Sequence, residues 1–321
     1  MKLHSLGISG LVTMNLHALN NEGAEGNTMM TRMVEIVDEN GKLHTVNGIS
    51  GDMFKHIQAE HLFQIAGQEG LPLCRGCQKF DANRICADES FTKRKSFSEN
   101  TKDSEILSEA LKSCILDDSE GILITSEIGK ARSIARKSCI EFGWVVGRPD
   151  STRTEAYFHA KYVPEGRGKG SGAGENLGQN IFHRPASSGQ YAVVVNVDLY
   201  KIGRNDITLN YDIPVADREK RIKALLLSLL NTFIKPTGAH RNTQNPHVLD
   251  FSGVVSTSTN AIPAPAVSAL NPHYCEEIEG VAQNLNNLEK TKPLQVQRFN
   301  GLASFSAVLG KIVQEVRAHG S

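Results

Sequence analysis

The sequence predicts an α+β fold of the split βαβ kind that carries insertions. The clearest strand is the β-branched run 191–200, and the clearest helix is 218–234, where apolar residues recur at helical spacing. Other strand-like and helix-like segments alternate irregularly along the chain. This order is compatible with one central antiparallel sheet.

The composition is that of an ordinary globular protein. The 321 residues are enough for a large core and about two domains, with 40% hydrophobic and 22% charged residues. Lys plus Arg and Asp plus Glu each total 35, so the formal net charge is zero. A nucleic-acid binder of this composition must gather its positive charge locally. We expect a cytoplasmic protein with no membrane partner, because neither a signal peptide nor a long apolar run is present.

The first elements follow from hydrophobic patterning. Apolar residues alternate loosely over 3–19, which predicts a long strand, and a polar loop is expected at 20–27. A hairpin is expected at 32–46, where Asn40-Gly41 is a strong turn signal. Residues 51–68 then predict a helix with one apolar face.

The composition changes after this helix. Residues 67–119 combine cysteines with a basic, polar stretch and a helix at about 104–116, which predicts an inserted subdomain. Strands are expected at 121–126, 138–146 and 154–163.

The last part contains the most flexible segment. The glycine-rich run 166–174 offers no apolar residue for packing, and no helix follows it as a P-loop requires. We interpret it as part of a mobile hairpin. A Pro-, Gly- and Asn-rich loop is expected at 236–272 and a closing helix at 302–316.

A cysteine cluster suggests a metal. Cys74-x-x-Cys77 with Cys86 supplies three thiolates, and His61 is close enough in sequence to be the fourth ligand of a tetrahedral structural zinc. Cys114 is distant in sequence from this cluster, so we do not include it among the expected ligands. The alternative is three incidental thiols in a loop-rich insertion, and no cofactor is required.

Polar donors lie at the ends of two predicted elements. His17 and Asn20 follow the first strand, and Lys55 and His56 lie in the first turns of the helix. Such groups suit a phosphate backbone better than bond-breaking chemistry. Neither a Gly-x-Ser-x-Gly elbow nor a His-Glu-x-x-His motif occurs, so we expect no enzymatic activity.

A further candidate loop follows the clearest helix. Gly238 and Ala239 would let a backbone approach a ligand, and Arg241 can pair with a phosphate bidentately. An ordinary helix-terminating loop is the alternative.

Taken together, these segments resemble the DevR-type backbone subunit of type I CRISPR Cascade complexes, which coats the guide RNA. The resemblance runs in consistent order from residue 1 to about 275. The matching residues are Asn15, His17, Leu19 and Asn20; Gly48, Gly51, Met53, Lys55 and His56; Phe182, Arg184, Ser188, Gly189 and Tyr191; Gly238, Ala239 and Arg241; and Ile262, Pro263 and Ala264.

The resemblance implies an RRM/ferredoxin-like palm with an inserted helical finger subdomain and a flexible thumb loop. The implied parts are the palm at 1–66 and 120–301, the finger subdomain with the cysteine cluster at 67–119, the thumb loop at about 164–189, the Gly/Pro-rich loop at 236–272 and a C-terminal helix at 302–321.

It also implies a non-enzymatic subunit whose copies assemble head to tail along the crRNA spacer. Its further partners would be target DNA and the small end-capping, crRNA-processing and large Cascade subunits. Phosphate contacts would come from Lys55, Arg153, Arg184 and Arg241, and other RNA contacts from His17, Asn20, His56, Gly238 and His240. Lys93, Arg94 and Lys95 are candidates for target DNA, or form a solvated charge run.

Two other functions stay open. One is a metal-dependent subunit that cleaves target RNA, with Asp52 as the acid nearest the groove. The other is a DNA-binding autoregulator, for which the sequence offers no helix-turn-helix pattern.

Overall fold

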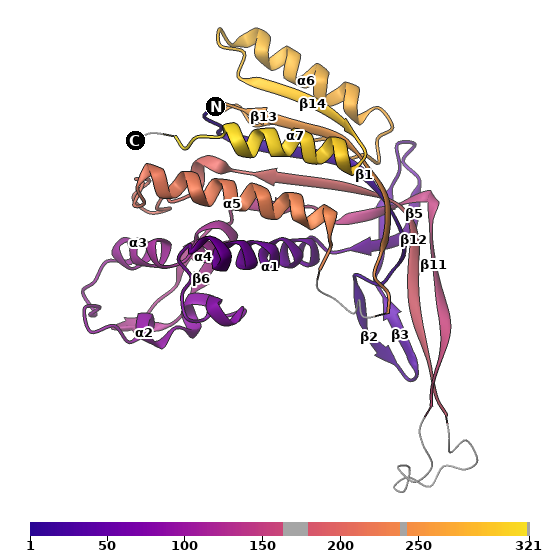
Figure 1. Ribbon diagram of the computed structural model, residues 1–321, viewed down its shortest axis with the longest axis horizontal. Coiled ribbons are helices and arrows are strands. Elements are labelled where there is room, and N and C mark those ends of the chain that lie inside the picture. Colours follow the sequence, from indigo (N-terminus) through magenta and orange to yellow (C-terminus); the bar gives the residue numbers. More distant parts are fainter. Residues whose placement is uncertain (163–178, 238–242, 320–321) are drawn as a thin grey trace, which may run out of the picture.

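The computed structural model describes residues 1–162, 179–237 and 243–319 (Figure 1). Its main feature is a long, almost entirely antiparallel sheet, so the predicted α+β class is confirmed. In spatial order the main strands are β14 (Leu294–Asn300), β13 (His247–Ser258), β1 (Ser5–His17), β12 (Gln179–Val197), β11 (Val145–Tyr162), β5 (Leu43–Ile49) and β4 (Met33–Val37).

The central part of the sheet has split βαβ connectivity. Along the chain, β1 is followed by α1 (Gly51–Glu69), the β11–β12 pair, α5 (Val215–Ile234) and β13. In space β12 lies between β1 and β11, while β13 pairs with the other edge of β1. This strand order is the one that the β-α-β-β-α-β sequence of elements produces.

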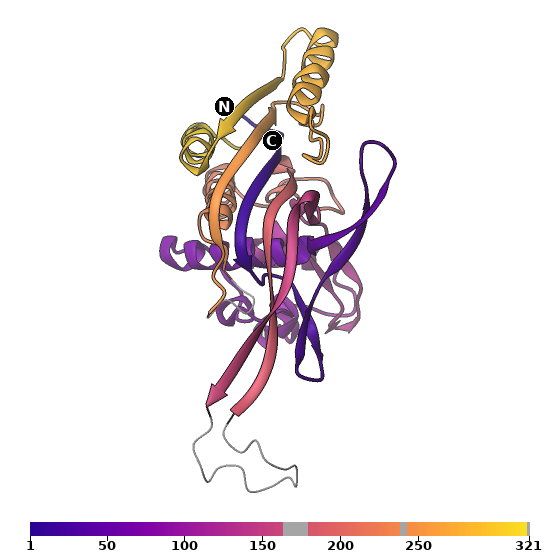
Figure 2. The same cartoon turned by 90° about the vertical axis from the view of Figure 1, so that its right-hand side faces the viewer.

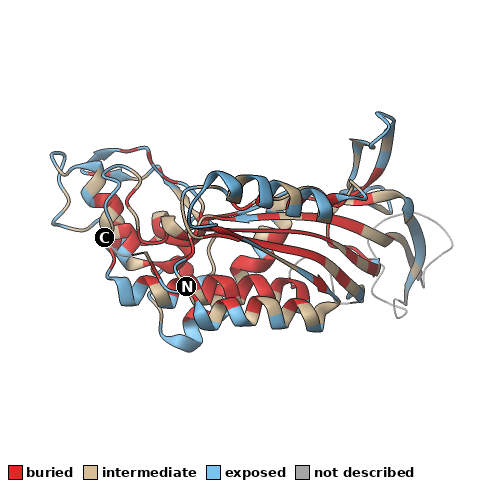
Figure 3. Cartoon of the chain, turned by 90° about the horizontal axis from the view of Figure 1, so that it is seen from above, coloured by how far each residue is buried: buried red, intermediate tan, exposed pale blue. Residues whose placement is uncertain are grey.

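Alternation along the strands places the core between the sheet and three helices. Leu6, Ile8 and Val12 of β1 belong to the same buried cluster as residues of α1, α5 and α7 (Leu302–Glu315). Leu11 points to the opposite face and packs near Tyr274 of α6 (Tyr274–Leu288). The α7, α5 and α1 helices therefore cover one face, and α6 covers part of the other (Figures 1 and 3).

Short elements fill the segment between α1 and β11. Cys114 adopts an extended conformation (φ −153°, ψ 127°), so the helix predicted at 104–116 is divided at that residue. The short elements are η1 (Cys77–Lys79), η2 (Arg84–Ala87), α2 (Glu89–Thr92), α3 (Asp103–Ser113), α4 (Ile115–Glu120), β6 (Ile122–Ile124), β7 (Glu127–Ile128), β8 (Lys130–Ala131), β9 (Ile134–Arg136) and β10 (Ile140–Phe142), with η3 (Leu199–Lys201) after β12.

Three predicted loops contain strands. β13 lies within the loop predicted at 236–272, and its backbone hydrogen bonds are made by pairing with β1 and β14. The polar loop predicted at 20–27 contains β2 (Asn21–Glu25), which pairs with β3 (Thr28–Thr31). Of the loop predicted at 164–189, residues 179–189 belong to β12, and 163–178 lie outside the described residues.

The predicted long helices and the first hairpin are confirmed. They correspond to α1, α5, α7 and the β4–β5 pair, whose turn contains Gly41 at φ +78°. The sequence did not predict α6 or β14. None of the described helices is long and apolar enough to cross a membrane.

Candidate nucleic-acid interface

A two-stranded hairpin projects from the body of the molecule. β11 and β12 continue together beyond the rest of the sheet, with the β2–β3 pair beside them (Figure 2). Six residues near its far end form what we call the hairpin surface: Tyr157, Phe158, His159, Phe182, His183 and Arg184. Directly opposite residues on paired strands share a face, so the register fixes which of these side chains meet.

One face of the hairpin combines aromatic rings with a guanidinium group. His159 lies opposite Phe182, and their rings stack with centroids 5.5 Å apart and an interplanar angle of 10°. The Arg184 guanidinium lies 4.8 Å from the centroid of the Phe182 ring, and Tyr157, opposite Arg184, is 44% exposed. This face therefore offers flat rings and a cation to a ligand.

The other face carries a further exposed aromatic side chain. Phe158 is 60% exposed and meets the ring of His183 edge to face at 5.9 Å. His183 also bridges to Thr28 of β3. A cavity of about 330 Å³ lies here, lined by Ala24, Gly26, Asn27, Met29, Phe182, His183 and Arg184.

The base of the hairpin depends on a glycine. The pairing of β11 with β12 shifts register between Gly147 and Thr152, and Gly189 faces this irregularity at φ +149°. A Cβ at Gly189 would lie 2.2 Å from the carbonyl oxygen of Ser151. Only glycine fits this backbone approach, so Gly189 sets how the hairpin leaves the sheet.

The sequence predicted that His17 lies at the end of a strand, available to a ligand, but the structure buries it. Its side chain is 1% exposed, its ring meets Tyr191 edge to face at 4.9 Å, and burial lowers its pKa to about 4. The reason is a register shift between Met14 and His17, with Leu16 at φ +53°. The shift turns Leu16 outward and His17 inward. His17 is therefore neutral and faces the core.

Asn20 is also buried, and its side chain organises the start of α1. The Asn20 Oδ1 accepts a hydrogen bond from the Ser50 backbone N–H at 3.1 Å. Ser50 is the N-cap of α1, and its hydroxyl accepts from the Met53 N–H. The sequence predicted that the Asn20 side chain contacts a ligand directly. In the structure its Oδ1 instead holds the backbone of Ser50 at the start of α1.

Lys55 and His56 line a different cavity, of about 330 Å³, at the first turns of α1. The Lys55 Nζ donates to Ser138 Oγ at 2.8 Å, and burial lowers the pKa of Lys55. His56 is exposed, with its ring 5.4 Å from that of Phe80. None of the residues that line this cavity also lines the cavity at the hairpin.

The remaining predicted contacts divide between the hairpin and undescribed chain. Arg153 and Arg184 both lie on the hairpin; the Arg153 side chain is 83% exposed and pairs with Glu155 at 2.7 Å. Gly238, His240 and Arg241 lie outside the described residues. Thr243, just after them, accepts a hydrogen bond from Arg184 at 3.2 Å.

The predicted metal ligands do not come together as a group. Cys74 and Cys77 are adjacent, but their neighbours are Cys114 and Asp117. The sulfur of Cys86 instead lies 3.7 Å from the Leu123 carbonyl oxygen, and the His61 Nε2 lies 2.8 Å from that of Lys235. Cys86 and His61 were therefore wrong as partners of Cys74 and Cys77.

A family model described as "CRISPR-associated negative auto-regulator DevR/Csa2" matches residues 8–279, which is most of the chain. The chain belongs to the DevR/Csa2 family. The resemblance drawn from the sequence is confirmed to that extent.

Solved structures similar to this DevR/Csa2 protein share little sequence with it. One is titled "CRISPR RNA-guided surveillance complex, pre-nicking"; it is 12% identical, the match covers 96% of this chain and 99% of that chain, and the TM-score is 0.49. Another is titled "CRISPR RNA-guided surveillance complex"; it is 11% identical, the match covers 97% of this chain and 98% of that chain, and the TM-score is 0.43. A third is a crystal structure of Csc2 from Thermofilum pendens; it is 12% identical, the match covers 96% of this chain and 84% of that chain, and the TM-score is 0.41. No curated protein matches the chain.

The aromatic part of the hairpin surface in this DevR/Csa2 protein was missed in the sequence. Its signal was present, because Tyr157-Phe158-His159 and Phe182-His183-Arg184 flank the glycine-rich run on both sides. Trp144 was missed as well; it is 46% exposed, and the Arg32 guanidinium lies 5.2 Å from its ring centroid. Aromatic rings beside arginines can stack bases and pair with phosphates.

Proposed function

We propose that this DevR/Csa2 protein is a non-enzymatic guide-RNA (crRNA) binding subunit that polymerises along the spacer. It would form the helical backbone of a type I CRISPR surveillance complex that recognises complementary DNA. Family membership supports the CRISPR context. The hairpin surface supports the mode of binding, and it is the observation on which the proposal depends.

The chemistry of the hairpin surface suits a single-stranded nucleic acid. Exposed rings such as Phe158 and Tyr157 stack on bases of any identity, because every base has a π face. Arg153 and Arg184 add cations on the same two strands. Because the whole chain has no net charge, such local cations must supply the attraction to phosphate. Binding would then depend on salt but not on spacer sequence.

Assembly would place copies of the chain head to tail. Such heterologous packing does not close on itself, so the RNA and end-capping partners would set the number of copies. The further partners in the proposal are target DNA and the small end-capping, crRNA-processing and large subunits, all in the cytoplasm. Sequence would be read by base pairing between the guide and its target.

The test starts from RNA that the protein acquires in cells. The full chain is expressed with and without a CRISPR array, and the co-purified RNA is sized. The proposal predicts RNA of uniform guide length only when the array is present. It also predicts equal affinity for two synthetic RNAs of unrelated sequence. RNA-free monomers in both preparations, or strong preference for one RNA sequence, would contradict it.

The same preparations separate the other two functions. A target-RNA nuclease predicts regular cuts in complementary RNA with magnesium that disappear in Asp52→Asn, since Asp52 is exposed at the start of α1. An autoregulator predicts tighter binding to duplex DNA from its own promoter than to RNA. Our proposal predicts neither result.

A further inference from the structure

A cluster of metal-ligating atoms lies away from the hairpin surface. The sulfur atoms of Cys74, Cys77 and Cys114 and a carboxylate oxygen of Asp117 all lie within 4.8 Å of one another, and all four residues are buried. They come from separate parts of the chain. Cys74 precedes η1 and Cys77 is its first residue, whereas Cys114 is the N-cap of α4 and Asp117 lies within that helix. We propose that these four side chains bind one structural zinc ion.

The donor set and its size fit tetrahedral zinc. Structural zinc sites use four ligands, predominantly cysteine, with Zn–S bonds of about 2.3 Å, so neighbouring sulfurs lie about 3.8 Å apart. Small movements of four side chains would contract the observed cluster to that size. Thiolate ligands favour zinc over hard cations such as magnesium or calcium.

A second observation comes from the carboxylate of Asp117. This residue is fully buried, and its Oδ1 has no hydrogen-bond partner among the residues that the structure describes. Its Oδ2 is 3.5 Å from the sulfur of Cys74. A buried carboxylate without a paired cation is unfavourable, so this group is suited to a positive ion placed among the three sulfurs.

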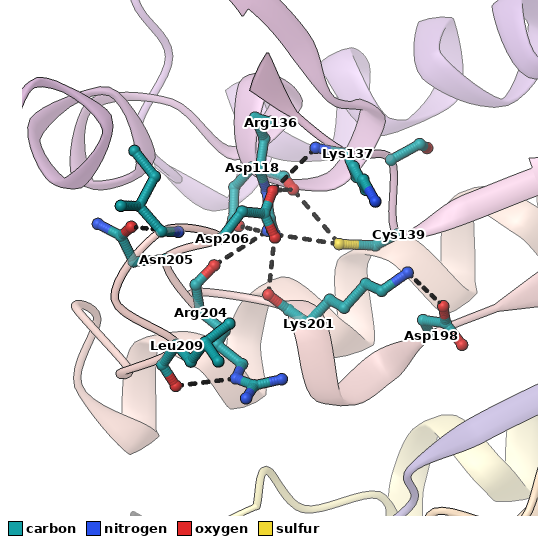
Figure 4. A network of polar contacts seen from close by, with 12 residues as sticks. Asp118, Arg136, Lys137, Cys139, Asp198, Lys201, Arg204, Asn205, Asp206 and Leu209 are labelled. Carbon is teal, nitrogen blue, oxygen red and sulfur yellow. Dashed lines mark hydrogen bonds and ion pairs between the residues drawn. The ribbon is translucent and has the colours of Figure 1, made fainter. Parts of the chain in front are cut away.

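The adjacent residue, Asp118, is a buried carboxylate that is paired with arginines. Asp118 is also fully buried, but its oxygens accept from Arg136 (Figure 4) and from Arg221, each at 2.8 Å, and from the Gly203 N–H. Asp117 and Asp118 therefore meet different surroundings on the same short helix. Asp118 has two arginine partners, whereas Asp117 faces sulfur.

The local backbone also supports the site. The Cys77 N–H donates to the sulfur of Cys74 at 3.3 Å, a contact that stabilises a metal-bound thiolate. Cys114 occupies the extended residue between α3 and α4. The break between these helices thus coincides with a ligand. Zinc would therefore link the segment around η1 to α4, two segments that lie about 40 residues apart in the sequence.

The test is metal content, with a matched cysteine control. The full chain is purified from zinc-supplemented cells without chelator, and zinc is measured by mass spectrometry. We expect one zinc per chain in the natural protein and in Cys86→Ser, and at least a tenfold lower content in Cys114→Ser and Asp117→Ala. Loss of zinc in Cys86→Ser with retention in Cys114→Ser would overturn the ligand set.

Two measurements on the natural chain cover the case in which the variants do not fold. After removal of metal, titration with Co²⁺ should produce thiolate-to-cobalt absorption that saturates at one ion per chain. Bound zinc should protect Cys74, Cys77 and Cys114, but not Cys86, from a thiol reagent. A folded chain that takes up neither ion, or a disulfide between two of the three cysteines, would overturn the proposal. RNA binding does not enter these readouts, so failure here is separate from failure of the proposed function.

Discussion

The buried network around Asp118 and the hairpin surface use similar chemical groups in opposite ways. In the network, Arg136 and Arg221 are buried and directed at one carboxylate. Arg136 also donates to the Lys201 and Arg204 carbonyl oxygens, as Figure 4 shows. On the hairpin, by contrast, Arg153 is exposed and aromatic rings such as that of Phe158 face solvent.

This difference separates groups that hold the fold from groups that are available to a ligand. Removing one partner of a buried ion pair leaves an uncompensated buried charge and lowers stability, and buried groups directed at one another are not accessible to a ligand. Exposed rings on a two-stranded hairpin add little to folding. Substitutions in the two regions should therefore change different measured quantities.

The largest effect is expected in the buried network. Asp118→Asn removes the charge that Arg136 and Arg221 share, and should lower the free energy of unfolding by about 3–5 kcal/mol. Asp217→Asn is the control, because its pair with Lys220 is exposed and should contribute about 0–1 kcal/mol. Urea unfolding measures both. Equal losses in the two variants would show that the buried network contributes no more to stability than an exposed ion pair does.

The next effect concerns pH and the buried histidine below the hairpin. Burial lowers the folded pKa of His17 to about 4 from 6.5, so the unfolded chain binds more protons between these values. Stability should fall as pH decreases from 6.5 to 4, by about 3 kcal/mol from this group. Burial raises the pKa of Glu120 to about 7, which acts in the opposite direction.

The difference between the natural chain and His17→Phe isolates this contribution. The variant keeps an aromatic ring against Tyr191 but cannot titrate. Urea unfolding at several pH values should show that the stability difference changes steadily between pH 6.5 and 4. A constant difference would show that His17 is not buried in the neutral form.

The third effect should appear in RNA binding and not in stability. Phe158→Ala removes a 60% exposed ring and should weaken single-stranded RNA binding by about 1–3 kcal/mol. Its free energy of unfolding should change by no more than about 0.5 kcal/mol. Leu288→Ala, at an 80% exposed residue of α6, is the matched control and should leave both quantities unchanged. Fluorescence anisotropy with labelled RNA measures the affinity.

The smallest effect should come from a single exposed cation. Arg153→Ala should reduce the slope of log affinity against log salt concentration by about 0.7 if Arg153 contacts one phosphate of a single strand. Lys290→Ala, at an exposed residue just after α6, should not change the slope. An unchanged slope in Arg153→Ala would indicate that the pair with Glu155 occupies this arginine.

The sequence predicted the elements whose patterning is local. The α1 and α5 helices and the β4–β5 hairpin follow from apolar spacing and from Asn40-Gly41. β13 was missed because Pro, Gly and Asn are common in the surrounding segment 236–272, and its strand conformation depends on pairing with β1 and β14. Such pairing cannot be recognised in the segment alone.

The candidate sites were predicted less well for the same physical reason. His17 was expected to be exposed, but a bulge near Leu16 reverses the alternation of inward and outward side chains. Cys114 was set aside because it is distant from Cys74 in sequence, although the two lie together in space. Arg153 and Arg184 were predicted as phosphate contacts but not as strand residues, because the strand was expected at 154–163 and the thumb loop at about 164–189. The aromatic residues around them were not recognised as a surface.

The most direct test of the proposed RNA contact is ultraviolet cross-linking of the assembled full chain to crRNA, with the cross-linked peptides identified by mass spectrometry. We predict cross-links within 152–162 and 179–190, at aromatic residues of the hairpin surface. Cross-links confined to α6 and β14, with none on the hairpin, would contradict the proposal.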